Sequence, residues 1–488
     1  MNIFPLIQCD FYKQGHYKMY PQDMTLLYSN FTPRKSRIEG INEVVVFGIQ
    51  YFIKEYLIEQ WQNNFFNEEK GLIIEKFKRY VDFTLGKDVV NSEHIEKLWD
   101  LGYLPLQIKA LPEGSLCPIG VPCLTIKNTH PDFGWLVNFL ETIISCTIWQ
   151  PMTSATIARQ YRKILDKYAL ETTGSKEFVQ WQGHDFSMRG MSSIESACLS
   201  GAGHLLYFTG TDTIPAIQFL EDYYNADIEE DLVGASVPAT EHSVMCVGMK
   251  DSEFETFEKL IDSHPTGILS IVSDTWDLWK VCTEYLPKLK EKIMARDGKV
   301  VIRPDSGDPV DILCGTYNME YEIKSPEQKG VIELLWGIFG GVETEQGYKV
   351  LDSHIGAIYG DSITLDRATQ ICERLKEKGF ASTNVVLGIG SFTYQYNTRD
   401  TFGFACKATY AEVGSKCLEI FKDPVTDDGT KRSAKGLISV FQNPLGRCEM
   451  IDCVDWNTEN KGELKTVFLN GKLVKDFTLQ EIRNLVNK

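Results

Sequence analysis

Long apolar runs are absent from this sequence of 488 residues, and residues 1–14 lack the basic and apolar regions of a signal peptide. No stretch approaches the roughly 20 apolar residues of a membrane span. Basic residues are also scarce, because 50 Lys and Arg stand against 67 Asp and Glu, which gives a net charge of −17. We therefore expect a cytoplasmic protein that binds neither membranes nor nucleic acid, since nucleic-acid phosphates require a basic face.

Paired cysteine motifs are missing as well. The 13 cysteines are odd in number and scattered, without a C-x-x-C motif or a Cys/His grouping of the kind that binds zinc. This distribution indicates reduced and mostly buried thiols. The apolar fraction of 43% is that of a globular protein. An anionic small substrate would need a locally basic pocket in this acidic chain.

The length predicts at least two lobes, because 488 residues exceed what one hydrophobic core supports. Residues 1–150 are predicted to form the N-terminal part of an α+β lobe. Residues 151–394 are predicted to form the catalytic domain, and residues 395–488 to complete the α+β lobe.

Apolar spacing in the first 170 residues predicts three helical stretches and a small β unit. Residues 41–63 and 69–85 have the spacing of amphipathic helices. Short apolar runs separated by Pro and Gly between residues 104 and 128 indicate antiparallel strands. A third helical stretch from residue 135 to residue 170 is expected to break near Pro151.

One arrangement recurs from residue 178 to residue 392: a short apolar strand, a polar or Gly-rich turn, and usually an amphipathic helix. Seven segments occupy the strand position, namely VQWQG, HLLYF, GASVP, ILSIVS, KVVI, GAIY and NVVL. The alternation predicts an α/β fold with an irregular (β/α) barrel, whose active site would lie at the carboxyl ends of the strands. It also fits an open doubly wound sheet, because periodicity alone does not separate the two.

The fifth of these strands ends abruptly in charge, within VVIRPDSGDP at residues 300–309. Its β-branched start is typical of a strand covered on both faces. Arg303 and Asp305 follow, and the surrounding Pro and Gly prevent a simple continuation of strand or helix. Taken alone, the motif is as compatible with a polar turn as with a site.

Polar and glycine residues end the other strands too, and together they predict one site. The set comprises Phe186, Arg189, Asp212, His242, Asp274, Arg303, Asp305, Gly360, Asp361, Gly388, Gly390, Ser391 and Arg399. Glycines let backbone N–H groups approach a phosphate, while Arg and His offer charge-assisted bonds to further phosphoryl oxygens. The aspartates are suited to Mg²⁺, directly or through water, or to ribose hydroxyls. This combination predicts a substrate with two separated phosphate groups.

The order and spacing of several motifs resemble the nicotinamide phosphoribosyltransferases, of the type II phosphoribosyltransferase family, across nearly the whole chain. These motifs are CDFYK at 9–13, GTDT at 210–213, SVPATEHS at 236–243, VSD at 272–274, VIRPDSG at 301–307, GD at 360–361 and FKDP at 421–424. The resemblance implies transfer of phosphoribosyl from 5-phosphoribosyl 1-pyrophosphate to nicotinamide, with nicotinamide mononucleotide and pyrophosphate as products in NAD biosynthesis. It further implies Mg²⁺, ATP as a co-substrate, and a homodimer with shared active sites.

The resemblance also implies roles for the pyridine-binding side chains. Phe186 and Tyr12 of the neighbouring chain would sandwich the pyridine, with Asp10 beside Tyr12. Asp212 would accept a hydrogen bond from the carboxamide. His242 would be phosphorylated by ATP; it would not act as a base, because the pyridine nitrogen attacks without losing a proton.

The remaining roles concern phosphates, ribose and metal. By the same resemblance, Arg189, His242 and Arg303 would contact pyrophosphate, Asp305 would lie near ribose and metal with Asp274, and Gly360, Asp361, Gly390, Ser391 and Arg399 would hold ribose and the 5′-phosphate. The basic residues Arg34, Lys407, Lys422 and Lys431 would reach phosphates, some across the dimer interface. One departure is visible, since GIGSF replaces the triple glycine of animal members at this phosphate loop.

Several alternatives remain at this point. The nearest is nicotinate phosphoribosyltransferase, which Asp212 argues against because two carboxylates would repel each other. A nucleotide-binding homologue without activity would not need the aspartates together with His242. A barrel aldolase or phosphatase lacks support, because none of these strand ends offers a Schiff-base lysine. Asp212 also suits the N-cap of a helix that opens near Pro215. The isolated histidines, such as His94, are expected to be structural.

Overall fold

The structure, a computed structural model, describes residues 3–316, 325–422, 425–426 and 433–487. The chain divides into two compact units. Unit 1 comprises Met1–Thr156, Leu220–Ala226 and Asn397–Lys488, and unit 2 comprises Ile157–Phe219 and Asp227–Tyr396. The short stretch Leu220–Ala226 thus belongs to unit 1, although it lies inside the segment predicted as the catalytic domain.

Unit 1 is built on a seven-stranded antiparallel sheet with the order β15–β14–β1–β5–β3–β18–β19. The strands are β1 (Met24–Thr32), β3 (Leu106–Ala110), β5 (Leu124–Asn128), β14 (Ala405–Val413), β15 (Lys416–Glu419), β18 (Lys465–Leu469) and β19 (Lys472–Leu473). β14 pairs with β1 and β18 pairs with β3. The C-terminal segment therefore completes a sheet that the N-terminal segment begins.

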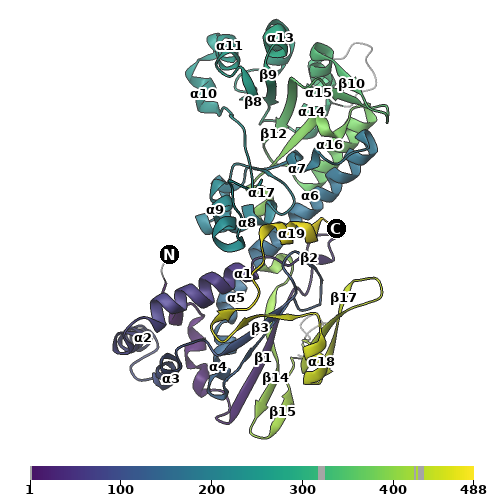
Figure 1. The fold of residues 1–488 in the computed structure, drawn as a ribbon. Coiled ribbons are helices and arrows are strands. Elements are labelled where there is room, and N and C mark those ends of the chain that lie inside the picture. Colours follow the sequence, from purple (N-terminus) through teal and green to yellow (C-terminus); the bar gives the residue numbers. More distant parts are fainter. Residues whose placement is uncertain (1–2, 317–324, 423–424, 427–432, 488) are drawn as a thin grey trace. The chain divides into compact units, whose positions relative to one another are not determined.

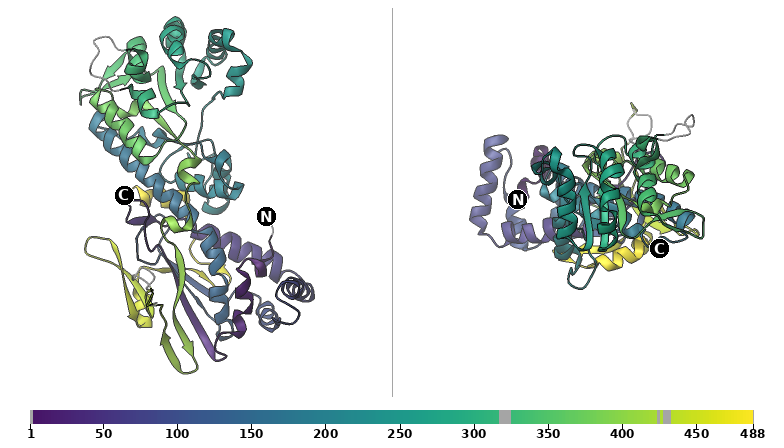
Figure 2. Two further views of the ribbon diagram at one scale, coloured as in Figure 1. Left: turned by 180° about the vertical axis from the view of Figure 1, so that it is seen from behind. Right: turned by 90° about the horizontal axis from the view of Figure 1, so that it is seen from above.

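Helices and two small hairpins surround this sheet. The helices are α1 (Ile49–Phe52), α2 (Lys70–Thr84), α3 (Glu93–Leu101), α4 (Gly134–Phe139), α5 (Glu141–Thr147), α18 (Trp456–Lys461) and α19 (Leu479–Val486), and the hairpins are β2 (Glu43–Val45) with β4 (Leu116–Pro118) and β16 (Leu437–Gln442) with β17 (Cys448–Val454). Figures 1 and 2 show α2, α3 and α4 on one side of the sheet and the β16–β17 hairpin on the other. Between sheet and helices lies one continuous apolar core, with Phe31, Phe77 and Ile126 nearly inaccessible to solvent.

Two helix predictions in unit 1 need correction. The stretch predicted as a helix from residue 41 begins with strand β2, because the β-branched residues after Glu43 pair with β4. The long helical stretch does not break at Pro151. It ends and restarts near Leu140 and Ile148, and α6 (Trp149–Thr173) holds Pro151 in its first turn, where a missing N–H is harmless.

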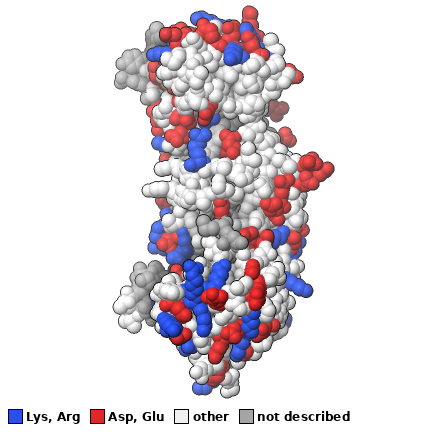
Figure 3. Space-filling model, turned by 90° about the vertical axis from the view of Figure 1, so that its left-hand side faces the viewer, with Lys and Arg blue, Asp and Glu red and all other residues white. Residues whose placement is uncertain are grey.

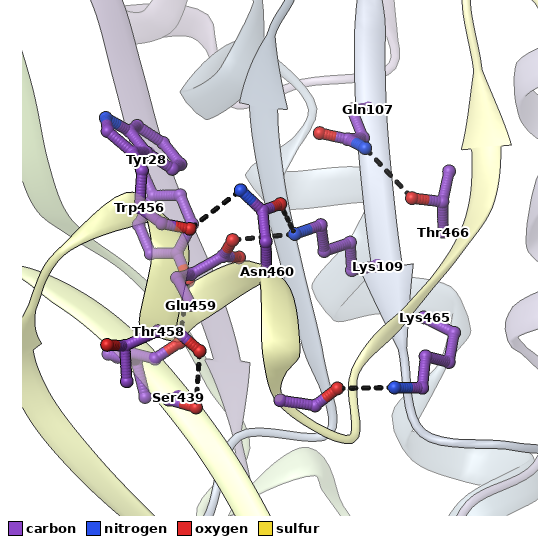
Figure 4. A network of polar contacts seen from close by, with 12 residues as sticks. Tyr28, Gln107, Lys109, Ser439, Trp456, Thr458, Glu459, Asn460, Lys465 and Thr466 are labelled. Carbon is purple, nitrogen blue, oxygen red and sulfur yellow. Dashed lines mark hydrogen bonds and ion pairs between the residues drawn. The ribbon is translucent and has the colours of Figure 1, made fainter.

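A buried ion pair attaches helix α18 to strand β3 (Figure 4). Lys109 Nζ lies 2.6 Å from Glu459 Oε2 and 2.7 Å from Asn460 Oδ1, and both charged side chains are buried. Beside it, the ring of Trp456 stands edge-on to Tyr28, 6.0 Å between centroids. Removing either charge would leave the other buried without a partner, which is costly in an apolar core.

Unit 2 contains a six-stranded parallel sheet with the order β7–β6–β13–β12–β9–β8. The strands are β6 (Gly183–Asp185), β7 (Gly210–Thr211), β8 (Thr266–Val272), β9 (Asp297–Arg303), β12 (Ile355–Tyr359) and β13 (Val385–Ile389). Residues 235–239 connect its edges, because Ala235 bridges Gly210 and Ala239 bridges Ser270, both in parallel. The strands follow one another in chain order around a ring, which identifies an irregular barrel and excludes the open sheet.

Four of the predicted strand segments coincide with β8, β9, β12 and β13, and GASVP lies in the bridging segment. The other two strand predictions are wrong. VQWQG is mostly helix α7 (Val179–Gln182), and HLLYF begins at the end of helix α8 (Ile194–His204). VQWQG alternates apolar and polar residues as a strand does, and HLLYF is a short apolar run that fits strand or helix, whereas β6 and β7 consist of Gly, His, Asp and Thr.

Helices wrap the outside of this barrel, as Figure 1 shows for α11 to α16. Besides α7, α8 and most of α6, unit 2 contains the first part of α9 (Ile214–Tyr224) and the helices α10 (His242–Val247), α11 (Glu253–Ser263), α12 (Leu278–Lys280), α13 (Leu286–Met294), α14 (Pro309–Cys314), α15 (Pro326–Phe339), α16 (Leu365–Glu377) and α17 (Ser391–Tyr394), with a short hairpin of β10 (Gly341–Glu343) and β11 (Lys349–Leu351). α16 illustrates the packing, since Ala368, Ile371, Cys372 and Leu375 recur at helical spacing and are all buried. Thr364 caps its first turn by accepting from Arg367 N–H.

Charge and apolar length complete the description of the fold. On the face drawn in Figure 3, Asp and Glu side chains are distributed with Lys and Arg between them. None of the helices in the described ranges combines the length and the apolar composition that crossing a bilayer requires.

Candidate active site

A cavity of about 950 Å³ lies at the carboxyl ends of the strands of unit 2. It is lined by most of the residues predicted from the sequence, namely Phe186, Arg189, Asp212, His242, Arg303, Asp305, Gly360, Asp361, Gly390 and Ser391. They come from six loops spread over more than two hundred residues of chain. They meet because the strands of a parallel barrel bring their carboxyl ends to one edge.

Phe186 directly follows β6, and its ring faces Arg303. The guanidinium carbon of Arg303 is 4.9 Å from the ring centroid, which is cation–π distance. Gly388 of β13 leaves the room that this ring occupies, because a Cβ there would stand 2.5 Å from Phe186 Cδ2. The aromatic surface and the cation are thus fixed side by side at the rim of the barrel.

Asp212 follows β7 and has one carboxylate oxygen fully engaged. His184 Nε2 lies 2.9 Å from Asp212 Oδ1, and Ser236 Oγ donates to the same oxygen at 2.5 Å. Burial alone raises the pKa of Asp212, but the His184 and Ser236 hydrogen bonds and the charge of Arg303 outweigh it, so the pKa lies below its usual value. Asp212 is therefore an ionised acceptor held by two neighbours. The hydrogen bonds of Asp212 Oδ1 go to His184 and Ser236 and not to the first turn of α9, so they do not support the alternative role as an N-cap.

Three carboxylates gather near His242 at the ends of β8, β9 and β12. Asp274 Oδ2 accepts from Asp305 N–H at 2.8 Å and from Ser306 Oγ at 2.6 Å. Its other oxygen is buried without a hydrogen bond in the described structure and lies 3.7 Å from His242 Nε2. Burial raises the pKa of Asp305; Arg303 opposes this rise, while the like charges of Asp274 and Asp361 add to it.

These carboxylates are suited to a cation that keeps much of its water. Clustered aspartates whose charges repel one another favour a nearby positive charge. Within the described ranges, however, no three His, Cys, Asp or Glu side chains are placed to hold a metal ion by themselves. Mg²⁺ commonly binds through one or two carboxylates with waters and substrate phosphates. The buried and unpaired oxygen of Asp274 fits that mode of binding.

The loops after β6 and β13 form the opposite wall of the cavity. Ser391 opens α17 and packs on Gly190, where a Cβ would stand 2.0 Å from Ser391 Oγ. Phe392, which takes the place of a glycine in the predicted phosphate loop, also lines the cavity and is half exposed. Its ring stacks on Tyr396 at 5.6 Å. The serine therefore fits against its neighbour loop, and the phenylalanine lies in the cavity wall with part of its side chain open to solvent.

The other predicted site residues belong to unit 1. Asp10, Tyr12, Arg34, Arg399, Lys407 and Lys422 lie there, and Lys431 lies outside the described residues. Tyr12 is 62% exposed, so its ring is free to meet another molecule. Asp10 accepts from Thr142 Oγ1 at 2.8 Å. The cavity described in unit 2 does not include these side chains.

Sequence reasoning missed His184 and Ser236, the two residues that hold Asp212. Ser236 opens the motif SVPATEHS, and its proximity to a strand end was a usable signal. His184 lies two residues before Phe186 and so faces the same side of β6. This signal was not used, because the sequence analysis predicted the strand at VQWQG, residues 179–183, and so before His184.

Comparisons with known proteins agree with this geometry. Residues 181–472 match the Nicotinate phosphoribosyltransferase (NAPRTase) family, and residues 4–108 match the Nicotinamide phosphoribosyltransferase, N-terminal domain. A nicotinamide phosphoribosyltransferase of Acinetobacter baylyi is 52% identical over 99% of this chain and 97% of its own length. A nicotinamide phosphoribosyltransferase of Mycoplasma pneumoniae is 35% identical over 90% of this chain and 95% of its own.

Two solved structures share the fold at low identity. The nicotinate-nucleotide pyrophosphorylase of Pyrococcus furiosus superposes with a TM-score of 0.59 at 15% identity, covering 98% of this chain and 93% of that one. Human nicotinic acid phosphoribosyltransferase gives 0.51 at 15% identity, covering 98% and 92%. The resemblance seen in the motifs is thereby confirmed, and the chain belongs to the nicotinate phosphoribosyltransferase family.

Proposed function

We propose that this enzyme transfers phosphoribosyl from 5-phosphoribosyl 1-pyrophosphate to nicotinamide in the cytoplasm, giving nicotinamide mononucleotide and pyrophosphate for NAD biosynthesis. The choice of nicotinamide as the acceptor rests on one observation, that the carboxylate of Asp212 lines the same cavity as the ring of Phe186. Its Oδ1 is occupied by His184 and Ser236, which leaves Oδ2 to accept from the base. A carboxamide N–H₂ is the complementary donor.

The same carboxylate disfavours nicotinate. At neutral pH nicotinate carries a carboxylate where nicotinamide carries an amide, and Asp212 is ionised because its pKa lies below the usual value. Two like charges in a partly buried site repel each other. Transfer of phosphoribosyl to nicotinate is therefore the second candidate function, and the ionised carboxylate of Asp212 argues against it.

The chemistry requires the pyridine nitrogen to attack the anomeric carbon while the bond from that carbon to pyrophosphate breaks. The attacking nitrogen has no proton to lose, so no base is needed. Positive charge develops on the ribose and negative charge on the leaving group, and Arg303 with Arg189 would stabilise the latter. Phe186 would stack on the pyridine and hold it in line for attack. Because this ring is already in position, part of the entropy cost of orienting the pyridine would be met when the pyridine binds.

Mg²⁺ would neutralise the pyrophosphate during this step. Asp274 and Asp305 are the residues that would hold it, directly or through water, because one oxygen of Asp274 is buried without a hydrogen bond, and because burial together with the like charges of Asp274 and Asp361 raises the pKa of Asp305. Asp361 would serve the ribose hydroxyls or the same ion. The sequence predicted Asp274 and Asp305 for the metal ion and Asp361 for the ribose.

His242 would carry a phosphoryl group from ATP and so couple hydrolysis to substrate binding. Its side chain is 51% exposed and lines the cavity at the start of α10, with Asp274 Oδ1 3.7 Å from Nε2. An exposed imidazole that lines the cavity beside a carboxylate is suited to act as a nucleophile. His242 does not need to act as a base, because the attacking pyridine nitrogen has no proton to lose.

The protein would act as a homodimer in which Tyr12 of one chain covers the pyridine of the other. Support comes from the high exposure of Tyr12 and of Phe11 beside it, which is 49% exposed. In a two-fold dimer each site would receive one such ring. Arg34, Arg399, Lys407, Lys422 and Lys431 are proposed to reach phosphates, some across the interface.

The proposed reaction is tested by incubating the protein with 5-phosphoribosyl 1-pyrophosphate, Mg²⁺ and either nicotinamide or nicotinate, with and without ATP, and separating the nucleotides by chromatography. We expect nicotinamide mononucleotide, formed faster with ATP. Nicotinate mononucleotide as the main product would favour the second candidate, and no nucleotide from either base would refute both.

A further inference from the structure

The two loops proposed to hold ribose and the 5′-phosphate meet at one buried carbonyl group. Ile363 is buried and lies in the loop after β12, three residues beyond Gly360. Its backbone oxygen accepts from Thr393 Oγ1 at 2.9 Å, and Thr393 belongs to α17, two residues beyond Ser391. The same oxygen accepts from the hydroxyl of Tyr161 at 2.8 Å. One atom therefore joins the two loops to a third element.

That third element is α6, where Tyr161 lies 202 residues before Ile363 in the chain. Tyr161 is fully buried, and burial raises the pKa of its phenol, so the hydroxyl stays protonated and can donate. The hydroxyl oxygen also lies 3.1 Å from Thr393 Oγ1. A carbonyl oxygen has two lone pairs and can accept from both hydroxyls at once. We call these three residues the Tyr161 cluster.

The loop after β12 has a backbone conformation that needs support from its neighbours. Ser362 has a φ of +52°, in the left-handed region that residues other than glycine seldom adopt. Such a conformation persists only where the surrounding structure holds it. The carbonyl of Ser362 accepts from Arg367 Nη1 at 2.7 Å, and the next carbonyl, that of Ile363, accepts from Tyr161. Side chains from α16 and α6 thus fix two successive carbonyl groups of this loop.

The other loop is held by side chains as well, because α17 is too short to be stable by itself. It comprises four residues, Ser391–Tyr394. Tyr394 Oη lies 2.8 Å from His204 Nδ1, while Thr393 Oγ1 donates to Ile363 O. The contact of Thr393 links α17 directly to the loop after β12.

From these contacts we infer that Tyr161 is a positioning residue for 5-phosphoribosyl 1-pyrophosphate. The described wall of the active-site cavity does not include Tyr161, so its hydroxyl would act through Ile363 and Thr393 by fixing the loop after β12 against α17. This role rests on the proposed function, which assigns the ribose and the 5′-phosphate to these two loops. The base would be held by Phe186 and Asp212, which take no part in the Tyr161 cluster. Binding of the base should therefore not depend on Tyr161.

The test is Tyr161→Phe, which removes the hydroxyl and keeps the ring. We expect KM for 5-phosphoribosyl 1-pyrophosphate to rise by about threefold to tenfold, because one hydrogen bond between uncharged groups is lost. KM for nicotinamide should stay at its wild-type value. Isothermal titration calorimetry with 5-phosphoribosyl 1-pyrophosphate and Mg²⁺, without a base, should show the same rise in Kd independently of turnover.

Variants of Thr393 test the cluster from its other side. Thr393→Val removes the second hydroxyl that donates to Ile363 O, whereas Thr393→Ser keeps a hydroxyl there and should largely restore the wild-type KM. Combining Tyr161→Phe with Thr393→Val removes both donors. The rise in KM for 5-phosphoribosyl 1-pyrophosphate should then exceed the product of the two single effects, because the two hydroxyls share one acceptor.

Tyr168 offers a matched control on the same helix. It is buried, lies seven residues further along α6, and donates from its hydroxyl to Glu373 Oε1 of α16 at 2.8 Å. Tyr168→Phe also loses one hydrogen bond, but the lost bond leads to neither loop, so both KM values should stay unchanged. Thermal unfolding would show that each variant is folded. A rise in KM for 5-phosphoribosyl 1-pyrophosphate as large as that of Tyr161→Phe would indicate a general loosening of α6 and would overturn the inference.

Unchanged KM and Kd for 5-phosphoribosyl 1-pyrophosphate in Tyr161→Phe, or equal rises in KM for both substrates, would also overturn it. The outcome is separable from the proposed reaction. An enzyme that forms nicotinamide mononucleotide with unchanged constants in Tyr161→Phe would refute only this inference. A protein that binds 5-phosphoribosyl 1-pyrophosphate more weakly in Tyr161→Phe but forms no nucleotide would refute only the proposed reaction, and a wild-type protein that does not bind it would refute both.

Discussion

Replacing Asp212 by Asn keeps the shape of the side chain and removes its charge. The amide oxygen can still accept from His184 or Ser236, but the second position becomes an N–H₂ that meets the carboxamide with donor against donor. A hydrogen bond to a charged group contributes about 1.5–3 kcal/mol. We therefore expect kcat/KM for nicotinamide to fall by about tenfold to a hundredfold, since 1.4 kcal/mol corresponds to a factor of ten.

The effect on nicotinate should have the opposite sign. Two charges 4 Å apart interact by about 4 kcal/mol at the effective dielectric constant of a partly exposed site. Removing one should raise kcat/KM for nicotinate, so the preference for nicotinamide should shrink by more than either change alone. Initial rates with each base, measured by chromatography of the mononucleotides, give this ratio.

Ser236→Ala is the matched control. It removes one donor to Asp212 but keeps the charge, so it should reduce activity on nicotinamide by a smaller factor and leave nicotinate disfavoured. An Asp212→Asn enzyme with an unchanged ratio between the two bases would show that Asp212 does not contact the group that distinguishes them.

Four further predictions concern coupling, assembly and stability. His242→Ala should lose ATP hydrolysis and the ATP-dependent gain in rate while keeping a slow transfer, and acid-labile labelling that persists in this variant would contradict the phosphohistidine. Mixing inactive Tyr12→Ala with inactive Asp212→Ala and re-equilibrating the dimers should restore up to about a quarter of wild-type activity if sites are shared; no recovery with heterodimers present would place each site within one chain. Burial lowers the pKa of His94 to about 3, below about 6.5 when unfolded, so stability should be lost as pH falls from about 6.5, by about 1.4 kcal/mol per pH unit, and denaturant titrations of His94→Phe should lack this slope. Lys109→Met should cost about 3–5 kcal/mol in the free energy of unfolding by leaving Glu459 buried alone, whereas the double variant Lys109→Met with Glu459→Leu should recover most of it.

The sequence predicted those parts of the fold in which apolar residues recur at a regular spacing or in which an apolar strand ends abruptly in charged residues. β9 was recognisable because three β-branched residues run directly into Arg303, and α16 because its apolar residues recur at helical spacing. β6 and β7 were not, because two or three polar residues and glycines have no strand signature and are held only by their neighbours. Closure of the barrel through Ala235 and Ala239 also depends on single bridges that no local pattern encodes.

The site was predictable where a residue type at a strand end already implied its chemistry. Asp212, Arg303 and Asp305 were found in that way, and the structure brings all three to one cavity. His184 was missed because its role is to hold another side chain, which appears only once β6 and β7 lie side by side.

The proposed function requires that this enzyme select nicotinamide over nicotinate as the acceptor of phosphoribosyl. The most direct measurement is a competition in one vessel, with equal concentrations of both bases, limiting 5-phosphoribosyl 1-pyrophosphate, Mg²⁺ and ATP, and quantification of the two mononucleotides by mass spectrometry. Their ratio at early times equals the ratio of the two kcat/KM values. We expect nicotinamide mononucleotide in large excess, and an equal or greater amount of nicotinate mononucleotide would refute this selectivity.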